Sequence, residues 1–563
     1  MKTEIRALVC LITICIAIVT NGATITVTSG EDSGAGTLRQ AILDASSNDT
    51  IDFSGVSLVT LTNEIADVGQ NGLIIDGGGT VSITTEGASR ALLIDRGDIQ
   101  WTLNGLTFTN CSTTSASGGG AIYLYRDAKL TANNCTFVDC TAPAGQGGAV
   151  SANRNVDQAY TNSTFINCSA LGNGGAIGCT SSYDLKVRLV DSTFINCSSL
   201  ANGGAVNVYW YQGNYFLYVE NSTFDSCSAV GHAGAIYASS QISSFELLDS
   251  TFTNCISGNQ AGAIFYDSQL GITSRVDNCS FVDNQSKERG GALVVGGTGY
   301  LTISDTSFIG NESTNSTGGA IMQGGVDNLT LEYCIFKENE AIDGGAISFQ
   351  LDYTLLNGCL FDGNIALRDG GAISAQSAGI TDVANSTFVN NRAGIYGGAI
   401  YASGINVPGE SFKIYNSTFT TNYCAGTRYG GITFSYNATN TAVYSSISYG
   451  NYTEGTTAGQ DFSSPTIENI ENCLIGDPTG WSAITETNNI TATDPLLGTL
   501  ADNGGPTLTI AISKNSPARD AGTNPLGLLY DQRGLGSPRE NPEGATDIGA
   551  FEYMATGTII FVL

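Results

Sequence analysis

A short pattern that recurs along most of the chain restricts its fold more than any other feature. Residues 163–177 (STFINCSALGNGGAI) and 192–206 (STFINCSSLANGGAV) are nearly identical, and weaker copies occur at intervals of 25 to 31 residues. Aligned on the aromatic residue of STF, the copies place Phe108, Phe137, Phe165, Phe194, Phe224, Phe252, Phe281, Phe308, Phe336, Phe361, Phe388 and Phe419 in one column. A unit this short cannot bury a hydrophobic face alone, so we expect the units to stack as a solenoid.

Each unit has the composition of short strands joined by tight turns. Runs rich in Thr, Ile, Val and Phe alternate with clusters of Gly, Asn and Ser, a pattern typical of strands rather than helices. Because side chains alternate between the faces of a strand, each Phe points to one face and the Thr or Ser before it to the other. The double glycine of the GGA motif fits a corner with positive φ. We therefore predict one β-coil per repeat and a buried column of stacked phenylalanines.

The position three residues after each Phe changes its character midway along the repeats. It is first Cys, at Cys111, Cys140, Cys168, Cys197, Cys227 and Cys255, and then Asn, at Asn284, Asn311, Asn339, Asn364, Asn391 and Asn422. Stacked Asn side chains form hydrogen bonds between coils, whereas stacked Cys side chains fill the same space as small hydrophobes. Neighbouring cysteines in such a column also lie within disulfide distance, so buried free thiols and oxidised pairs both remain open.

The N-terminal part of the chain precedes the clear repeats. Residues 1–22 have the basic start, apolar run and small residues of a secretory signal peptide. Residues 23–100 are expected to form an N-terminal cap and the leading coils. Within them, Thr37 and Gln40 have the spacing of a capping box, which predicts a short helix near residues 38–46.

The repeats are expected to occupy residues 101–460, after which their motifs disappear. Proline then becomes frequent, which indicates a turn-rich structure. We expect residues 461–553 to form a separate module packed on the C-terminal end of the solenoid, followed by a tail over residues 554–563.

Composition excludes some classes of function. The chain carries 51 acidic against 22 basic residues, and its net charge of −29 repels nucleic acid and anionic membranes. No apolar stretch after the signal peptide is long enough to span a membrane. The sequence contains a single histidine and no C-x-x-C pair, so we assign no metal ligand, no cofactor site and no catalytic residue.

Several stretches resemble known families. FVDNQSKERGGAL (281–293) and FDGNIALRDGGAI (361–373) resemble the repeats of the polymorphic outer membrane protein family. The segments DPLLGTLADNGGPTLTIAISKNSPARDAG (494–522) and TDIGAFE (546–552) resemble the choice-of-anchor Q domain found at the ends of exported bacterial β-helix proteins. These resemblances imply an all-β fold, a right-handed parallel β-helix solenoid with a short N-terminal capping helix, and a secreted or cell-surface adhesin.

The function expected from this resemblance is structural and adhesive, with extracellular glycans or surface proteins as partners. One alternative is a carbohydrate-active enzyme, a polysaccharide lyase or glycoside hydrolase, because such enzymes share the fold. Another is a coat component without a ligand. The acids that recur before the glycines, Asp343 and Asp369, are interpreted as solvated turn residues rather than as a catalytic pair.

Two groups of residues are candidates for contacts at the surface. The aromatic stretch NVYWYQGNYFLYV contains Tyr209, Trp210, Tyr211 and Tyr215, whose rings would stack on sugars or anchor a protein where they face outward. The NST sequons are candidates for sparse N-glycosylation in a eukaryotic secretory pathway, at Asn162, Asn221, Asn385 and Asn416.

Overall fold

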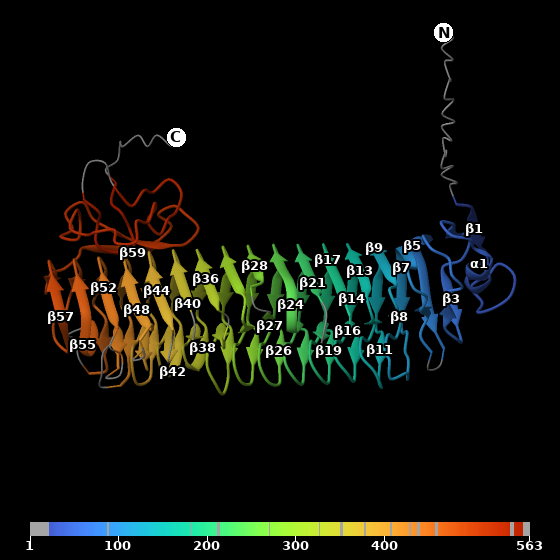
Figure 1. Cartoon of the computed structure of the whole chain (residues 1–563), viewed down its shortest axis with the longest axis horizontal. Helices are drawn as coiled ribbons and strands as arrows, with labels where there is room; N and C mark the ends of the chain where they lie inside the picture. The colour runs from blue at the N-terminus through green and yellow to red at the C-terminus, as the bar shows by residue number, and fades with distance from the viewer. Residues whose placement is uncertain are drawn as a thin grey trace, which may run out of the picture.

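The computed structural model is a long rod of stacked β-coils with a smaller, irregular module on one flank (Figure 1). It describes residues 22–554 except for 87–88, 182, 211–213, 269–270, 326, 350–352, 377–378, 406–407, 427–429, 436–437, 439, 456–459 and 541–544. The predicted signal peptide, apart from its last residue, and the predicted tail, apart from its first, lie outside the described residues. Among the residues described, no helix is long and apolar enough to cross a membrane.

A typical coil contains four strands: β16 (Ile177–Ser181), β17 (Leu185–Val190), β18 (Thr193–Ile195) and β19 (Ser198–Ser199). Each strand pairs in parallel with its counterpart in the next coil, namely β20 (Val206–Trp210), β21 (Tyr215–Glu220), β22 (Thr223–Asp225) and β23 (Ser228–Ala229). Strands of the first three kinds belong to one 46-stranded sheet, and those of the fourth kind form a 12-stranded sheet. The predicted all-β, parallel β-helix fold is confirmed.

The phenylalanines stack in register, as the repeat predicts. Phe165, Phe194 and Phe224 are paired residues of adjacent coils, and their neighbouring ring centroids are 4.7 Å apart with planes within 2° of parallel. None of the three is exposed. The strands that carry this column are β7 (Gln100–Thr109), β10 (Thr136–Val138), β14 (Thr164–Ile166), β18, β22, β25 (Thr251–Thr253), β29 (Ser280–Val282), β33 (Ser307–Ile309), β37 (Ile335–Lys337), β41 (Leu360–Asp362), β45 (Thr387–Val389) and β49 (Thr418–Thr420).

The two glycines of the GGA motif have different roles. Gly174 has a φ of +68°, a left-handed conformation that glycine adopts without steric cost. For Gly175, a Cβ atom would lie 2.0 Å from the carbonyl oxygen of Gly204 in the next coil, so this position requires the absence of a side chain. Two coils carry alanine at the first position, Ala233 and Ala261, with φ near +60°. The second glycine is therefore the stricter requirement.

The residues three positions after each phenylalanine form two different buried ladders. In the first half, the thiol of Cys168 contacts the carbonyl oxygen of Phe137 in the preceding coil at 3.5 Å. In the second half, the amide nitrogen of Asn311 donates to the equivalent oxygen of Phe281 at 3.0 Å and to Asn339 Oδ1 at 3.0 Å. All thirteen described cysteines are buried and unpaired, so the structure corresponds to the free-thiol alternative.

The asparagine ladder ends on a buried carboxylate. It continues one coil beyond the predicted column to Asn451, whose amide donates to Asp461 Oδ1 at 2.7 Å. Burial raises the pKa of Asp461 to about 6. The last coils therefore place an ionisable group inside the core.

One short helix lies at the N-terminal end of the rod, α1 (Leu38–Asp44) (Figure 1). Thr37 caps it by accepting a hydrogen bond from the backbone N–H of Gln40 at 3.3 Å. Leu38, Ala41 and Ile42 are buried, so the helix covers apolar residues of the first coils. Half of the predicted capping box forms, because the Gln40 side chain donates instead to Asp44 at 2.8 Å.

Parallel pairing continues beyond residue 460, where the sequence placed the end of the repeats. The strands β55 (Phe462–Glu471), β56 (Leu474–Ile475), β57 (Trp481–Thr487) and β58 (Ile490–Thr491) still pair with the preceding coils. The chain then leaves the rod and forms the antiparallel pair β59 (Leu497–Ala501) and β60 (Thr509–Ile512). We call residues 493–554 the flank module.

The flank module lies along the side of the rod, and not on its C-terminal end as the sequence analysis expected (Figure 1). The residue before each phenylalanine explains the difference. It is Thr or Ser in most coils, but Leu360 and, in the coils after the last phenylalanine, Ile447 and Leu474 take this place. These three side chains are buried against the module. Burial of this apolar part of the flank stabilises the lateral position.

Candidate functional site

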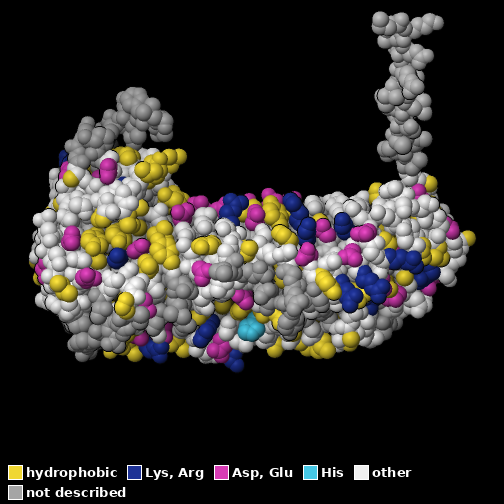
Figure 2. Space-filling view, in the orientation of Figure 1, with side chains coloured by type: hydrophobic (Ala, Val, Ile, Leu, Met, Phe, Trp, Pro, Cys, Tyr) yellow, Lys and Arg dark blue, Asp and Glu magenta, His cyan; other side chains and the backbone are white. Residues whose placement is uncertain are grey.

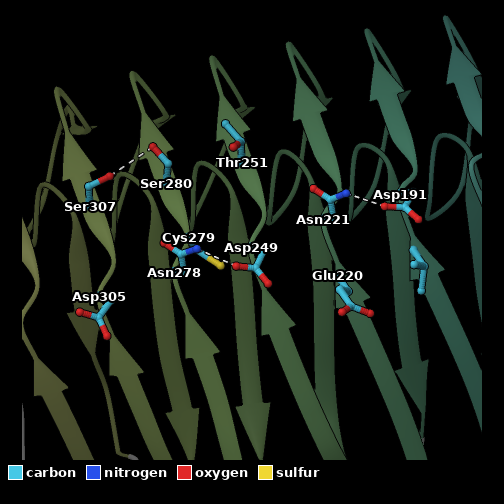
Figure 3. A pocket seen from close by; sticks show the side chains of 11 residues that line it. Asp191, Glu220, Asn221, Asp249, Thr251, Asn278, Cys279, Ser280, Asp305 and Ser307 are labelled. Carbon is cyan, nitrogen blue, oxygen red and sulfur yellow. Dashed lines mark hydrogen bonds between the residues drawn. The ribbon is translucent and has the colours of Figure 1, made fainter.

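An open groove runs along the rod (Figure 3). At one end, its residues Asp305 and Ser307 also lie beside Pro506 of the flank module. The volume of the groove is about 680 Å³. One wall is formed by the residues that lie three positions before the phenylalanine in each coil. We call this row of residues the corner column. The other wall is formed by the residues directly before the phenylalanine in each coil. We call this row of residues the outward column. The residues that line the groove are Val190, Asp191, Glu220, Asn221, Asp249, Thr251, Asn278, Cys279, Ser280, Asp305 and Ser307.

The corner column consists mainly of Asn and Asp because its backbone is left-handed. Asp191, Asn221, Asp249 and Asn278 have φ values between +48° and +52°, a region in which Asn and Asp are strongly favoured among non-glycine residues. Asn221 Nδ2 donates to Asp191 Oδ1 at 2.5 Å, and Asn278 Nδ2 donates to Asp249 Oδ1 at 2.6 Å. Figure 3 shows these two pairs running along the rod. The amide donors of this wall are thus bonded within the wall.

The outward column supplies hydroxyl groups to the other wall. Thr251, Ser280 and Ser307 precede their phenylalanines on β25, β29 and β33, and the three residues are in register. Ser307 Oγ donates to Ser280 Oγ at 3.2 Å. The column therefore presents a row of hydroxyls repeated at the strand spacing, about 4.8 Å.

The groove is acidic. Its lining includes the carboxylates of Asp191, Glu220, Asp249 and Asp305 and no Lys or Arg. Burial, followed by the nearby charge of Asp277, raises the pKa of Asp305. Such a surface favours ligands that bring positive charge or hydrogen-bond donors. The described part of the chain holds no cluster of three or more His, Cys, Asp or Glu placed to bind a metal ion.

Further along the flank, the corner column is covered by the module. Asn385 Nδ2 donates to the carbonyl oxygen of Tyr530 at 2.8 Å, and Asn416 Nδ2 donates to that of Thr523 at 2.9 Å. Arg539 Nη2 donates to Asn385 Oδ1 at 2.5 Å. Figure 2 shows the module as a raised mass at this end of the rod. The corner column is therefore a surface that this chain itself uses for docking.

The outward column takes part in the same docking. The hydroxyl of Thr387 donates to Gln532 Oε1 at 2.5 Å. The hydroxyl of Thr418 accepts a hydrogen bond from the backbone N–H of Ala550 at 3.0 Å. Both threonines are buried. Hydroxyl groups of this column thus bind both side-chain and backbone groups of the module.

A buried ionic cluster holds the module together. The guanidinium of Arg539 is fully buried and lies 3.4 Å from Glu552 Oε2. Arg533 pairs with Asp531 at 2.6 Å. Burial, followed by the charge of Asp547, raises the pKa of Glu552 to about 8. Because removal of one partner would leave a buried charge uncompensated, this cluster makes the module sensitive to substitution.

Of the four predicted aromatic contact residues, the structure describes the side chains of Tyr209 and Tyr215. Tyr209 is half-buried on β20. Tyr215 is wrong as a contact residue, because strand alternation turns its ring into the core and it is 0% exposed. The side chain of Trp210 and the whole of Tyr211 lie outside the described residues.

The four predicted glycosylation sites fall into two classes. Asn162 and Asn221 are exposed. Asn385 and Asn416 are buried beneath the module, where their amide nitrogens donate to backbone carbonyls. A glycan on either nitrogen would break these bonds and displace the module. In the folded protein, these two asparagines are therefore wrong as glycosylation sites.

The recurring acids before the glycines are not solvated, contrary to the sequence interpretation. Asp343 and Asp369 are 1% and 8% exposed, and Arg368 forms ion pairs with both. Burial, followed by the charge of Asp343, raises the pKa of Asp369 to about 6. The guanidinium between the two carboxylates compensates their charge, as expected of a structural ion-pair cluster.

The groove was missed by reasoning from the sequence. Its signal is the Asn and Asp alternation before the phenylalanines of successive repeats, at Asp191, Asn221, Asp249 and Asn278. Their exposure depends on where the module stops, which no local pattern encodes.

Comparisons with known proteins support the repeat in one part of the chain. The model of the Chlamydia polymorphic membrane protein repeat matches residues 358–376 and 385–403. No curated protein sequence matches the chain. A solved structure described as "Crystal structure of pectate lyase Pel9A" is 11% identical, covers 95% of this chain and 97% of its own, and has a TM-score of 0.19. Together, the repeat match and the parallel β-helix suggest a β-helix protein exposed at a cell surface.

Proposed function

We propose that this chain is a secreted or cell-surface protein with a structural and adhesive role. Its rod would present an elongated surface to extracellular glycans or surface proteins. The observation that carries this proposal is the open groove on the flank, which repeats Asp or Asn in one column and Thr or Ser in the other over successive coils (Figure 3). Repeated identical positions favour binding of an extended partner along the rod.

Two further features support the proposal. The N-terminal sequence has the pattern of a secretory signal, and the matched repeat is that of a polymorphic membrane protein. The flank module resembles the choice-of-anchor Q domain in sequence, and we propose that it retains the protein at the surface. Its docking on the rod leaves the groove uncovered.

Cell fractionation tests the location. The full chain and a chain truncated after residue 492 should be expressed and compared in surface, membrane and medium fractions, with protease added to intact cells. This truncation preserves the paired coils, because β58 ends at Thr491. We expect the full chain at the surface and the truncated chain in the medium. Retention of the full chain inside protease-resistant cells would contradict the proposal.

Binding without turnover tests the role. Purified protein should be applied to an array of extracellular glycans and to intact cells, and also incubated with polyuronates. Binding with no new sugar ends supports adhesion. Release of unsaturated or reducing ends from polyuronates would instead establish the carbohydrate-active enzyme. Self-assembly with no binding at all would establish the coat component.

A further inference from the structure

We propose that the open groove binds an extended polypeptide segment of a partner protein that carries Arg or Lys at every third residue. This inference rests on the proposed adhesive function and names the partner of the same surface. It follows from three observations: the continuity of the groove with the docking site of the flank module, the change in charge between the two, and the spacing of the carboxylates.

Continuity is shown by the register of the coils. The outward column stays in register from Thr251, Ser280 and Ser307 in the groove to Thr387 and Thr418 beneath the module. Between the two sets of hydroxyls it carries the apolar side chains of Ile335 and Leu360. The corner column accompanies it. Beneath the module, both columns hold irregular segments of polypeptide through hydrogen bonds to backbone and side chains. The coils of the groove therefore carry the same two columns, and among the described residues the module reaches only the end of the groove, where Pro506 borders Asp305 and Ser307.

The corner column differs in charge between the groove and the part beneath the module, and this difference indicates what kind of segment the groove binds. Beneath the module the corner column is neutral, with Asn385 and Asn416 donating to carbonyl oxygens. In the groove, Asn221 donates to Asp191 within the wall, so the wall presents carboxylate oxygens. Cationic donors form stronger hydrogen bonds with carboxylates than with neutral carbonyl groups. The bond from Arg539 to Asn385 Oδ1 shows that a guanidinium reaches the oxygen atoms of this column.

The spacing of the acids sets the period of the partner. Asp191, Asp249 and Asp305 lie in every second coil, so neighbouring carboxylates are about 9.6 Å apart along the rod. In a polyproline II segment, three residues advance the chain by about 9.3 Å and return to the same face. In a β-strand, side chains on one face are about 6.8 Å apart and fall out of step with the acids. A polyproline II segment with a basic residue at every third position therefore matches all three carboxylates.

The proposal is tested with a labelled twelve-residue peptide of sequence (Arg-Pro-Ser)₄, using fluorescence anisotropy and the purified full chain. A second peptide of the same composition, with its four arginines adjacent, controls for charge alone. The test variant is Asp191→Asn with Asp249→Asn. Asparagine keeps the Oδ1 acceptor and tolerates the left-handed backbone, so we expect the variant to fold.

The matched control variant is Asp139→Asn with Asp283→Asn. These two aspartates also have left-handed backbones, with φ of +53° each, and do not line the groove. Both variants change the net charge equally. Thermal unfolding and circular dichroism of each variant show whether the fold is retained.

We expect the spaced peptide to bind the wild type and the control variant equally, and the groove variant about tenfold more weakly, since each exposed ion pair contributes up to about 1 kcal/mol. Equal weakening in both variants, or equal binding of the clustered peptide, would reduce the effect to net charge and overturn the proposal. Absence of peptide binding would also overturn it. The adhesive function would survive that result if the protein still bound glycans or cells.

Discussion

The two halves of the rod fill the same buried position with different chemistry. In the first half, Cys168 and Cys197 present thiols to the carbonyl oxygens of Phe137 and Phe165 at 3.5 and 3.6 Å. In the second half, the amide of Asn339 donates to the carbonyl oxygen of Phe308 at 2.9 Å. The backbone and the phenylalanine stack are the same in both halves. The position therefore requires a small side chain that reaches one oxygen atom, and either residue type satisfies it.

The difference lies in how much each ladder depends on its neighbours. An asparagine in this column donates to both neighbouring coils and accepts from the preceding one, so its loss leaves several buried polar groups unsatisfied. A thiol is a weak donor and behaves mainly as a small hydrophobe. We therefore expect a single substitution in the asparagine ladder to lower the free energy of unfolding more than the equivalent substitution in the cysteine ladder.

The largest effect is expected for Asn339→Ala. Its Oδ1 accepts from the backbone N–H and the side chain of Asn311, both at 3.0 Å, and its Nδ2 donates to Phe308 and to Asn364. We expect a loss of about 4 kcal/mol in the free energy of unfolding of these coils, because buried polar groups are left unpaired. Hydrogen exchange of the Asn311 amide, with and without denaturant, measures it. A loss below about 1 kcal/mol would contradict the ladder's proposed strength.

The second effect concerns pH and belongs to the asparagine half alone. The pKa of Asp461 is raised from its ordinary value to about 6, so the folded state binds a proton more tightly than the unfolded chain. Stability should be greatest below about pH 4 and fall as the pH rises through 6, by about 3 kcal/mol. Thermal unfolding at pH 4 and pH 7 of the wild type and of Asp461→Asn isolates this contribution. Parallel pH profiles for the two proteins would show that Asp461 does not titrate in this window.

A smaller effect is expected for Cys197→Ala. The substitution removes one buried sulfur atom and its weak contacts with the carbonyl oxygens of Phe165 and Ile195, which should cost about 1.5 kcal/mol. The measurement is the same exchange experiment on the flanking coils, with Asn339→Ala as the reference. If Cys197→Ala were as damaging as Asn339→Ala, the two ladders would be energetically equivalent.

A still smaller loss of stability is expected when an exposed asparagine is replaced. Asn162 has a φ of +49° and donates to Asn134 Oδ1 at 2.5 Å on the surface of the cysteine half. Glycine adopts this conformation readily, and the exposed hydrogen bond is replaced by water. We expect Asn162→Gly to change stability by less than about 0.5 kcal/mol. A large loss in thermal unfolding would show that the corner column, and not the interior ladder, stabilises the coils.

The smallest effect is expected from a reducing agent. All thirteen described cysteines are unpaired, and burial raises the pKa of the Cys168 thiol well above its ordinary value. Dithiothreitol should leave the midpoint of thermal unfolding unchanged, and alkylating agents should label these thiols only after denaturation. A lower midpoint under reducing conditions would instead reveal disulfides in the cysteine column.

The fold was predictable because the local sequence of each repeat determines its strands and turns. The alternation around Phe165 sets its face, the turn residues set the corners, and the regular spacing sets the register between coils. The same pattern predicted the change from Cys to Asn. These are properties of neighbouring residues, which a sequence displays directly.

The position of the flank module was not predictable in the same way. Asn385 and Tyr530 are 145 residues apart in sequence, yet they share a hydrogen bond. The NST motif at Asn162 is exposed, and the same motif at Asn385 is buried, although nothing within the motif distinguishes them. The groove, the burial of two sequons and the lateral docking all depend on contacts of this kind between distant segments.

The parallel pairing of the coils also determines how the rod carries mechanical load. Its interstrand hydrogen bonds, such as that from the Thr193 N–H to the Ser163 oxygen at 2.9 Å, connect one coil to the next along the long axis. Tension applied to the two ends therefore pulls these bonds apart coil by coil. Each coil that detaches releases about 90 Å of extended chain. The flank module bridges the coils from Gly358 to Leu474, so it braces that end, and extension should start among the unbraced coils nearer the N-terminus.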